Sequence, residues 1–510
     1  MKLFKSIVCL VLALIMAFSC CSMAFAAETK DNTEVYPQIL VTGFGSGCVK
    51  IYYEDDPEQK SLFWPFEKDR FIANLANIGD YIKKALKDKN TTVIHSIVYN
   101  YVMDCFGMLA LNPDGSSMDG VVTEPVGVRY ASEGKYDFYY DCRLSPLVTA
   151  DYLREGILQV LRETGAEKVE LVGSSYGANV VTAYMYKYPE DLSKVDTVLQ
   201  CVPSVGGIRF MGELFSGNFD INALAFCDFI DRLAGEGVIP DFFYLMQEAG
   251  VLGLFFDMLA EPVLKKAVYD AIADVGRDFI ATLPAMWVSV PDEYFEDAMK
   301  FLYGENYNDP SLKYADLIAE MNFYHYEVAN KAADIYLQAE KDNEDFNMAL
   351  ITKFGVAAIP FGTGKNIMDD GLVTVPVSSF GATCATYKAK LPADYKQAKY
   401  PEYNFMSPEW NIDASTGAFP FRTWYIKGLE HTAKNADYLV LIDEIVNRDL
   451  TVFTDPEIPQ YLTVSAEDPE KIEILVAEEK EETLYTKIWN VIREIVLFGA
   501  NIANKFLGRA

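Results

Sequence analysis

Histidine is scarce among the residues that carry chemistry in this sequence: the chain of 510 residues has 3 histidines, alongside 9 cysteines. No two cysteines have the C-x-x-C spacing that is typical of zinc sites. A zinc ion needs several nitrogen or sulfur ligands that converge on it. We therefore expect no metal site, and no motif predicts a cofactor.

Positive charge is also in short supply. Lysine and arginine total 44 against 74 aspartates and glutamates, which gives a formal net charge of −30. Proteins bind a phosphate backbone mainly through positive charge, so we expect no nucleic acid partner. The same negative charge opposes anionic membrane surfaces, so any contact with lipid must come from apolar side chains.

Apolar residues, by contrast, make up 51% of the chain, and 14% of the residues are aromatic. This composition excludes a disordered protein, and the length allows one large core or two domains. The N-terminus has Lys2 and Lys5, an apolar run at 7–18 and a small-x-small sequence at 24–26. It predicts a signal peptide over residues 1–26 and an extracellular protein, either secreted freely or associated with the cell surface or a membrane.

The cysteines leave two questions open. Cys20 or Cys21 would carry a lipid if the chain were a lipoprotein, which is the alternative to a simple cleaved signal peptide. Export permits disulfides, but scattered cysteines in a chain of this size also serve as small buried apolar residues. The cysteines that follow residue 26 are Cys48, Cys105, Cys142, Cys201, Cys227 and Cys384.

Strand and helix patterns alternate over the first part of the chain. This alternation predicts an α/β fold with a mostly parallel central sheet that is covered on both faces. Strand character returns at 348–360, so we expect the core in two parts, 27–205 and 347–455. The predicted strands are 36–41, 136–140, 168–172 and 195–202, with a strand-like run at 91–102, and the predicted helices are 74–87, 151–164 and 178–188.

Helical periodicity with apolar clusters occupies residues 206–346, between the two parts of the predicted core. In parallel sheets, ligands bind beyond the carboxyl ends of the strands, and a helical insertion there can cover them. We therefore expect a large helical cap or lid. The alternative is an ordinary second helical domain.

Two further segments follow the predicted core. Residues 456–485 are acidic, and we expect a solvated linker there. Residues 486–510 have the spacing of an amphipathic helix with a broad apolar face. Arg493 and Glu494 near its middle argue against a membrane-spanning helix, which leaves either an interfacial helix or one docked on the core.

The sequence G-S-S-Y-G at 173–177 directly follows the apolar run 169–172 and precedes a helical pattern. Glycines on both sides of a serine let the backbone turn sharply from strand to helix and expose the hydroxyl, as in a nucleophile elbow. We therefore predict that Ser175 is a nucleophile. The alternative is a serine that only caps the following helix.

A serine nucleophile needs a histidine to accept its proton and an acid to orient that histidine. In hydrolases with this elbow, the order along the chain is serine, acid, histidine. His95 precedes the serine, and His325 lies within the helical segment. We therefore predict that His431, in a connection of the core, is the base.

The acid should lie on a turn after a strand, between the serine and the histidine. Asp369 and Asp370 precede Gly371 and follow the strand region 348–360. Taken alone, such a sequence is usually only a turn. Given the order along the chain, we predict Asp370 as the acid, because the adjacent glycine frees its turn, with Asp369 as the fallback.

An oxyanion hole needs two backbone N–H groups, one from the residue after the nucleophile and one from a loop after an earlier strand. Tyr176 follows the serine, and Phe44 lies in the turn Gly43-Phe44-Gly45 after the strand 36–41. We predict these two N–H groups as the donors. The alternative is a glycine-rich turn that binds nothing.

Taken together and in this order, these segments resemble the lecithin:cholesterol acyltransferase family of α/β-hydrolases, over roughly residues 36–445. The sequence departs from the family pattern at Thr42, Cys142, Ser174, Tyr176 and Leu372. The matching segments are Gly43-Phe44-Gly45 for its P-G-F-G turn, Tyr140-Asp141-Cys142-Arg143 for Y-D-W-R, 173–177 for G-H-S-M-G, Pro203-Ser204-Val205-Gly206-Gly207 for A-P-x-G-G and Asp370-Gly371 for D-G-T-V.

The resemblance implies an α/β-hydrolase fold with a cap, the triad Ser175, Asp370 and His431, and a lipid acyl ester as substrate. We expect Asp141 and Arg143 to be structural. The expected function is that of an O-acyltransferase, lipase or phospholipase, with lipid-surface contact through the cap and the C-terminal helix. The alternatives are a carboxylesterase on soluble esters and a non-catalytic surface or binding protein with the same scaffold.

Overall fold

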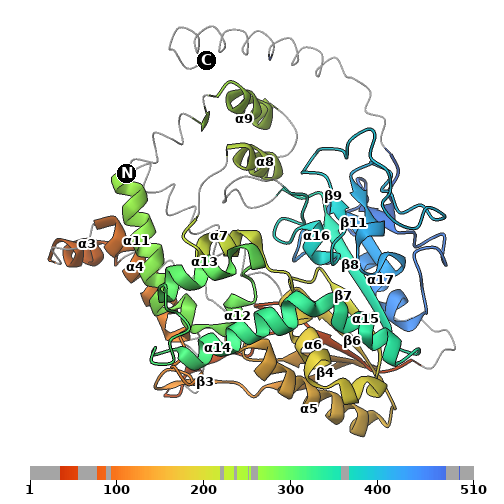
Figure 1. Cartoon of the computed structure of the whole chain (residues 1–510), viewed down its shortest axis with the longest axis horizontal. Helices are drawn as coiled ribbons and strands as arrows, with labels where there is room; N and C mark the ends of the chain where they lie inside the picture. Colours follow the sequence, from red (N-terminus) through yellow and green to blue (C-terminus); the bar gives the residue numbers. More distant parts are fainter. Residues whose placement is uncertain are drawn as a thin grey trace.

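A nine-stranded sheet with helices on both faces forms the centre of the molecule in this computed structural model (Figure 1). The predicted α/β fold with a mostly parallel central sheet is thus confirmed. The predicted signal peptide lies outside the described residues, as does the C-terminal helix apart from Arg493. The structure describes residues 35–55, 77–87, 93–218, 223–234, 238–250, 252–253, 262–357, 367–477 and 493.

Neighbouring strands of the sheet run parallel from β12 to β5, and the two outermost strands, β13 and β4, run antiparallel to their neighbours. The carboxyl ends of the parallel strands therefore share one edge of the sheet. In sheet order the strands are β13 (Ile472–Ile474), β12 (Tyr461–Val464), β11 (Thr423–Lys427), β8 (Asn347–Phe354), β7 (Val195–Cys201), β6 (Val169–Ser174), β1 (Gln38–Val41), β5 (Lys135–Tyr139) and β4 (Gly127–Ser132). Two small sheets pair β2 (Ile51–Tyr53) with β3 (Val121–Thr123) and β9 (Thr383–Cys384) with β10 (Ile412–Asp413).

Both faces of the sheet are buried because its strands are apolar on both sides. In β1, Ile39 and Val41 belong to the apolar cluster on one face, and Leu40 belongs to the cluster on the other. Strands that are buried on both faces read as continuous apolar runs rather than alternating ones. This explains why the central strands were predicted correctly from the sequence.

The helices fall into a core set and a set inserted between β7 and β8. In the core, α5 and α6 pack on one face of the sheet and α17 packs on the other. The core helices are α3 (Ile78–Lys87), α4 (Val93–Phe106), α5 (Pro146–Thr164), α6 (Tyr176–Lys187), α16 (Val375–Ser378) and α17 (Ala436–Asn447). The inserted helices are α7 (Arg209–Phe215), α8 (Ala223–Ala234), α9 (Val238–Glu248), α11 (Pro262–Asp278), α12 (Pro284–Trp287), α13 (Asp292–Tyr303), α14 (Ala315–Phe323) and α15 (Ala332–Asp342).

The inserted helices do not all pack against the same part of the molecule. Trp287, Phe295 and their neighbours form one apolar cluster, which also includes Val373 beyond the insertion. The last inserted helix, α15, instead packs on α6 and β8, where the Tyr336 hydroxyl lies 3.0 Å from Thr182 Oγ1. The end of the segment 206–346 therefore covers the sheet. Among the described residues, no helix has the length and apolar character that crossing a membrane requires.

Two expectations about secondary structure were wrong. Residues 93–102 of the strand-like run lie in α4, whose buried residues Ile97, Tyr101 and Cys105 recur every four positions and so form one face of a helix. The predicted acidic linker 456–485 contains β12 and β13. Tyr461 and Leu462 are buried against the sheet, so the acidic residues around them do not make the whole segment solvated.

Candidate active site

Ser175 lies directly after β6, between the strand and the first turn of α6. Its backbone has φ 53° and ψ −119°, a conformation that is strained for any residue with a Cβ. The Ser175 N–H donates to the Cys201 carbonyl at the end of β7 (3.0 Å). The elbow predicted from the glycine spacing is therefore present in the backbone.

The two glycines of the elbow are required by close approach of the backbone. A Cβ on Gly177 would lie 1.9 Å from the carbonyl oxygen of Val41, and one on Gly173 would lie 2.9 Å from the Cα of Ala178. Side chains at either position would push α6 away from β1 or from β6. These contacts explain in physical terms why the motif needs glycine on both sides of the serine.

Asp370 lies in the turn after β8, and its side chain is fully buried. One carboxylate oxygen, Oδ1, accepts hydrogen bonds from the N–H groups of Leu372 (3.0 Å) and Val373 (2.8 Å). Asp369, the predicted fallback, accepts from the Gly371 N–H instead (2.8 Å). Asp369 therefore shapes the turn, and Asp370 is the acid that faces the site.

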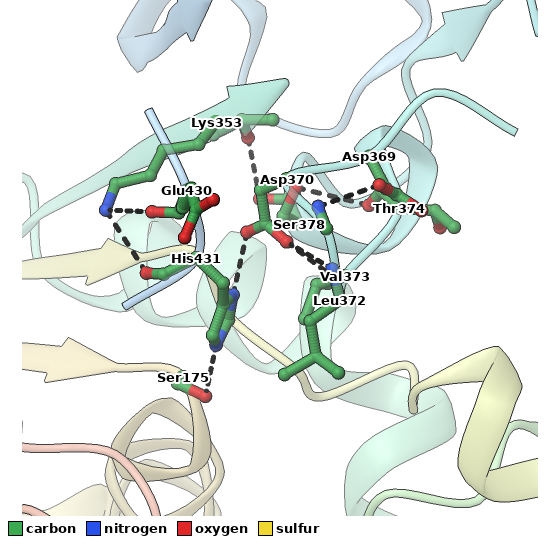
Figure 2. A network of polar contacts seen from close by, with 12 residues as sticks. Ser175, Lys353, Asp369, Asp370, Leu372, Val373, Thr374, Ser378, Glu430 and His431 are labelled. Carbon is green, nitrogen blue, oxygen red and sulfur yellow. Dashed lines mark hydrogen bonds and ion pairs between the residues drawn. The ribbon is translucent and has the colours of Figure 1, made fainter. Parts of the chain in front are cut away.

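His431 lies in the loop between β11 and α17 and joins the other two residues (Figure 2). Its Nδ1 lies 2.7 Å from Asp370 Oδ2, and its Nε2 lies 2.8 Å from Ser175 Oγ. The backbone N–H of His431 also donates to the Asp370 carbonyl (2.9 Å). The three predicted triad residues are thus brought together from three strand ends, with hydrogen-bond geometry between each pair of neighbours.

The other two histidines also contact aspartates, but through the opposite ring nitrogen. His95 Nε2 lies 2.8 Å from Asp274, which joins α4 to α11. His325 Nε2 lies 2.9 Å from Asp292 at the start of α13. In both pairs the acid occupies the nitrogen that His431 presents to the serine, and each pair links two helices.

The turn predicted to carry the second oxyanion donor lies beside the nucleophile. A Cβ on Gly43 would lie 2.9 Å from Ser175 Cβ and 3.4 Å from its Oγ, so only glycine allows this approach. Phe44 is the next residue. Tyr176 begins α6, where the first backbone N–H groups have no acceptor within the helix.

The Tyr176 side chain points away from the reacting groups. It is 3% exposed, its hydroxyl donates to the Leu144 carbonyl (3.0 Å), and its ring stacks on Tyr140 at 5.8 Å. The large residue at this position therefore fills the core behind the elbow. The ring also contacts the Phe44 ring edge-to-face, with the ring centres 6.2 Å apart, so this position borders the turn beside the nucleophile.

A disulfide joins Cys48, in the turn after β1, to Cys142, after β5. The departure from the family pattern at Cys142 is therefore matched by a second cysteine. Asp141 and Arg143 form a buried ion pair, with Arg143 Nη2 2.7 Å from Asp141 Oδ2. The same Nη2 donates to Ser117 Oγ (2.7 Å), in accord with the structural role that we expected for the pair.

Sequence reasoning missed Lys353 in β8, a lysine that is 1% exposed. Its Nζ donates to the carbonyls of Glu430 (3.2 Å), His431 (3.2 Å) and Ala433 (2.6 Å). The only signal in the sequence is a single charge near the end of a strand whose other residues are largely apolar. Such a lysine normally points to solvent.

No group of three or more histidine, cysteine or acidic side chains is placed to hold a metal ion within the part of the chain that the structure describes.

No family model and no curated protein matches the chain. Among solved structures, it is similar to a chain of the crystal structure of the Tle4–Tli4 complex, with 13% identity, coverage of 63% of this chain and 75% of the other, and a TM-score of 0.24. A similarity with a TM-score this low assigns neither a fold family nor a function to the chain.

Proposed function

We propose that this chain is an exported serine-dependent acyl enzyme with an α/β-hydrolase fold and a helical cap, related to the lecithin:cholesterol acyltransferases. One observation carries the proposal: Ser175 Oγ, His431 and Asp370 form a continuous relay with contacts of 2.8 and 2.7 Å. The relay stands at the carboxyl edge of a parallel sheet, where such folds bind substrate.

In the proposed mechanism, the His431 Nδ1–H donates a hydrogen bond to the buried Asp370 carboxylate, which stays ionised, fixes the ring and leaves Nε2 free to act as a base. Ser175 Oγ attacks the ester carbonyl while its proton passes to Nε2. The resulting imidazolium is stabilised by Asp370 and then gives the proton to the departing alkoxide. An acyl-serine remains, and water or an alcohol, deprotonated by His431, releases the acyl group.

The negative charge that develops on the substrate carbonyl oxygen would be stabilised by the N–H groups of Phe44 and Tyr176. The approach of Gly43 to Ser175 supports this assignment, because it brings the turn of Phe44 next to the attacking oxygen. The disulfide between Cys48 and Cys142 supports it further by tying the end of that turn to the chain after β5.

The proposed substrate is a lipid acyl ester, with acyl transfer or hydrolysis decided by whether an alcohol or water reaches the acyl-serine. The resemblance in sequence supports this class, as does the helical insertion after β7. Contact with a lipid surface through the insertion and the C-terminal helix belongs to the same proposal. A carboxylesterase acting on soluble esters is the second candidate, because the departures at Tyr176 and Leu372 from the family pattern concern the site itself.

Covalent labelling tests whether the serine is activated. We expect a fluorophosphonate probe to label the wild-type protein and the variant Ser174→Ala, and not Ser175→Ala, because only a serine that is paired with a base attacks the phosphorus. Ser174 is a matched control, since it is the neighbouring serine at the end of β6. Labelling that survives in Ser175→Ala would sink the assignment, and an unlabelled wild type would favour the non-catalytic binding protein.

Turnover then separates the substrate classes. A lipid enzyme should hydrolyse a medium-chain ester faster above its critical micelle concentration than below it, whereas a carboxylesterase should saturate on the monomer. Vesicles of phospholipid and sterol, followed by mass analysis of the products, distinguish a free fatty acid from a transferred acyl group.

A further inference from the structure

Lys353 is a charged side chain buried next to the relay, at the end of the central strand β8. Its exposure is 1%, and its strand lies between β7 and β11 in the sheet. Its side chain extends toward the loop that carries His431 (Figure 2). A buried ammonium is unfavourable unless each of its N–H groups has a partner.

Lys353 finds those partners in the backbone of the His431 loop. An ammonium has three N–H donors, and Nζ contacts three carbonyl oxygens, those of Glu430, His431 and Ala433, at 3.2, 3.2 and 2.6 Å. The nitrogen also lies 4.4 Å from the centre of the Tyr438 ring, at the start of α17, a distance at which a cation is attracted to the ring face.

Two backbone hydrogen bonds also tie the loop to neighbouring segments close to the histidine. It leaves β11 at Gly428, whose N–H donates to the Phe354 carbonyl (2.8 Å), and the His431 N–H donates to the Asp370 carbonyl (2.9 Å). These two bonds use N–H groups only. Without the lysine each of the three carbonyls would lose a hydrogen bond, although the Glu430 carbonyl would keep the one from the Ala433 N–H (3.1 Å). Losing such a bond at a partly buried carbonyl is destabilising.

We infer that Lys353 is a positioning residue for the reaction: its ammonium gathers the carbonyls at 430, 431 and 433 and so keeps the His431 ring between Asp370 and Ser175. This inference rests on the proposed function, because it assigns Lys353 a part in the same relay. Lys353 contacts the backbone of the loop rather than the reacting atoms, so it acts through His431.

The protonation state of Lys353 is sensitive to pH near neutrality. Burial lowers its pKa from 10.5 to about 7, against the opposing effect of the Asp370 carboxylate. Burial also raises the pKa of the Cys201 thiol and that of the Tyr438 hydroxyl, so both stay neutral there. The titratable and charged groups that face the ammonium are Asp370, Glu430, His431, Lys434, Cys201 and Tyr438.

Deprotonation of Lys353 should have two effects. It should weaken the hydrogen bonds that hold the His431 loop, and it should raise the free energy of unfolding. A neutral amine has two N–H groups and turns a lone pair toward the third carbonyl, so the histidine is held less well above pH 7. The folded pKa of Lys353 lies below its unfolded value, so between about 7 and 10.5 the unfolded chain binds the extra proton. The contribution of Lys353 to the free energy of unfolding therefore rises with pH over that window.

The test compares Lys353→Met with Lys427→Met. Lys427 lies in the adjacent strand β11 and pairs with Glu409 at 2.5 Å, so its loss removes a lysine from the same sheet without touching the loop. We expect Lys353→Met to lower kcat on a short soluble ester by about 100-fold with little change in KM, because misplacing a reacting group by about 1 Å has an effect of that size. Lys427→Met should stay within about twofold of wild type.

The pH profile separates positioning from a merely structural role. Because His431 titrates in both proteins, the ratio of wild-type kcat to Lys353→Met kcat isolates the lysine, and this ratio should fall as pH rises through about 7. If Lys353→Met does not fold, the same ratio is measured with Lys353→Gln, whose amide retains two N–H donors and does not titrate. A variant with near-normal kcat, or a ratio that does not fall above pH 7, overturns the inference. A wild type that is also unreactive toward fluorophosphonate overturns the proposed function, whereas a reactive wild type leaves that function standing.

Discussion

The histidine at the sheet edge and the histidine of the helical insertion make the same kind of contact with an aspartate, yet only one of them faces a nucleophile. His431 contacts Asp370 through Nδ1, and His325 contacts Asp292 through Nε2. The Asp370 side chain is 0% exposed, whereas that of Asp292 is 68% exposed. The His325 ring also stacks on Phe295 at 3.7 Å.

The difference teaches that a histidine–aspartate pair is not by itself a catalytic unit. What distinguishes His431 is the nitrogen that its acid occupies and the strand ends that bring a serine to the other one. His325 has burial and an acid but serves to join α13 to the segment after α14. Substituting the two pairs in parallel therefore measures catalysis and packing separately.

The largest effect should come from the histidines themselves. We expect His431→Gln to lower kcat/KM by roughly 10⁴- to 10⁶-fold, because the serine loses its base. His325→Gln should keep kcat/KM per folded molecule close to wild type. Ester hydrolysis measured on both variants, with folding checked by circular dichroism, makes the comparison, and equal losses in the two would show that neither pair is the catalytic one.

The next largest difference in kcat should be between variants of the two aspartates, Asp370 and Asp292. Asp370→Asn should lower kcat by about 10⁴-fold, since an amide at this position favours the wrong tautomer of the histidine and does not stabilise the imidazolium. Asp292→Asn should leave kcat unchanged and change only the melting temperature. An Asp370→Asn variant that retains most of its activity would move the role of the acid to Asp369.

The smallest effect concerns stability in acid. Burial lowers the pKa of His325 below 6.5, and the hydrogen bond to His325 lowers the pKa of Asp292. Because the folded pKa of His325 is the lower one, its contribution is full above about 6.5 and is lost as pH falls toward that folded value. Between pH 7 and about pH 5, the melting temperature of the wild type should therefore drop further than that of His325→Gln. Equal drops would contradict the conclusion that burial lowers the pKa of His325.

The triad could be predicted from the sequence because each part of it leaves a local trace. The glycines at 173 and 177 are needed wherever a helix starts this close to two strands, and the scarcity of histidine left few choices for the base. The turn glycine after Asp370 indicated the acid in the same way. These are short-range requirements, so a single sequence reveals them.

What could not be predicted depends on partners distant in the chain. The run 91–102 has the composition of a strand, yet its residues from 93 onward belong to a helix that packs against α3 and α11. Lys353 reads as an exposed charge because its three acceptors are backbone carbonyls some eighty residues later, which have no signature in the side-chain sequence. The strands β12 and β13 were hidden by the acidic residues around them.

The backbone of Ser175 has a consequence for how the protein balances durability against activity. At φ 53° and ψ −119° the serine Cβ strains the backbone, and glycine, which has no Cβ, would remove that strain. A Ser175→Gly chain should therefore tolerate heat better than the natural one while having no nucleophile. The sequence retains, at the point of attack, a residue that selection for stability alone would remove.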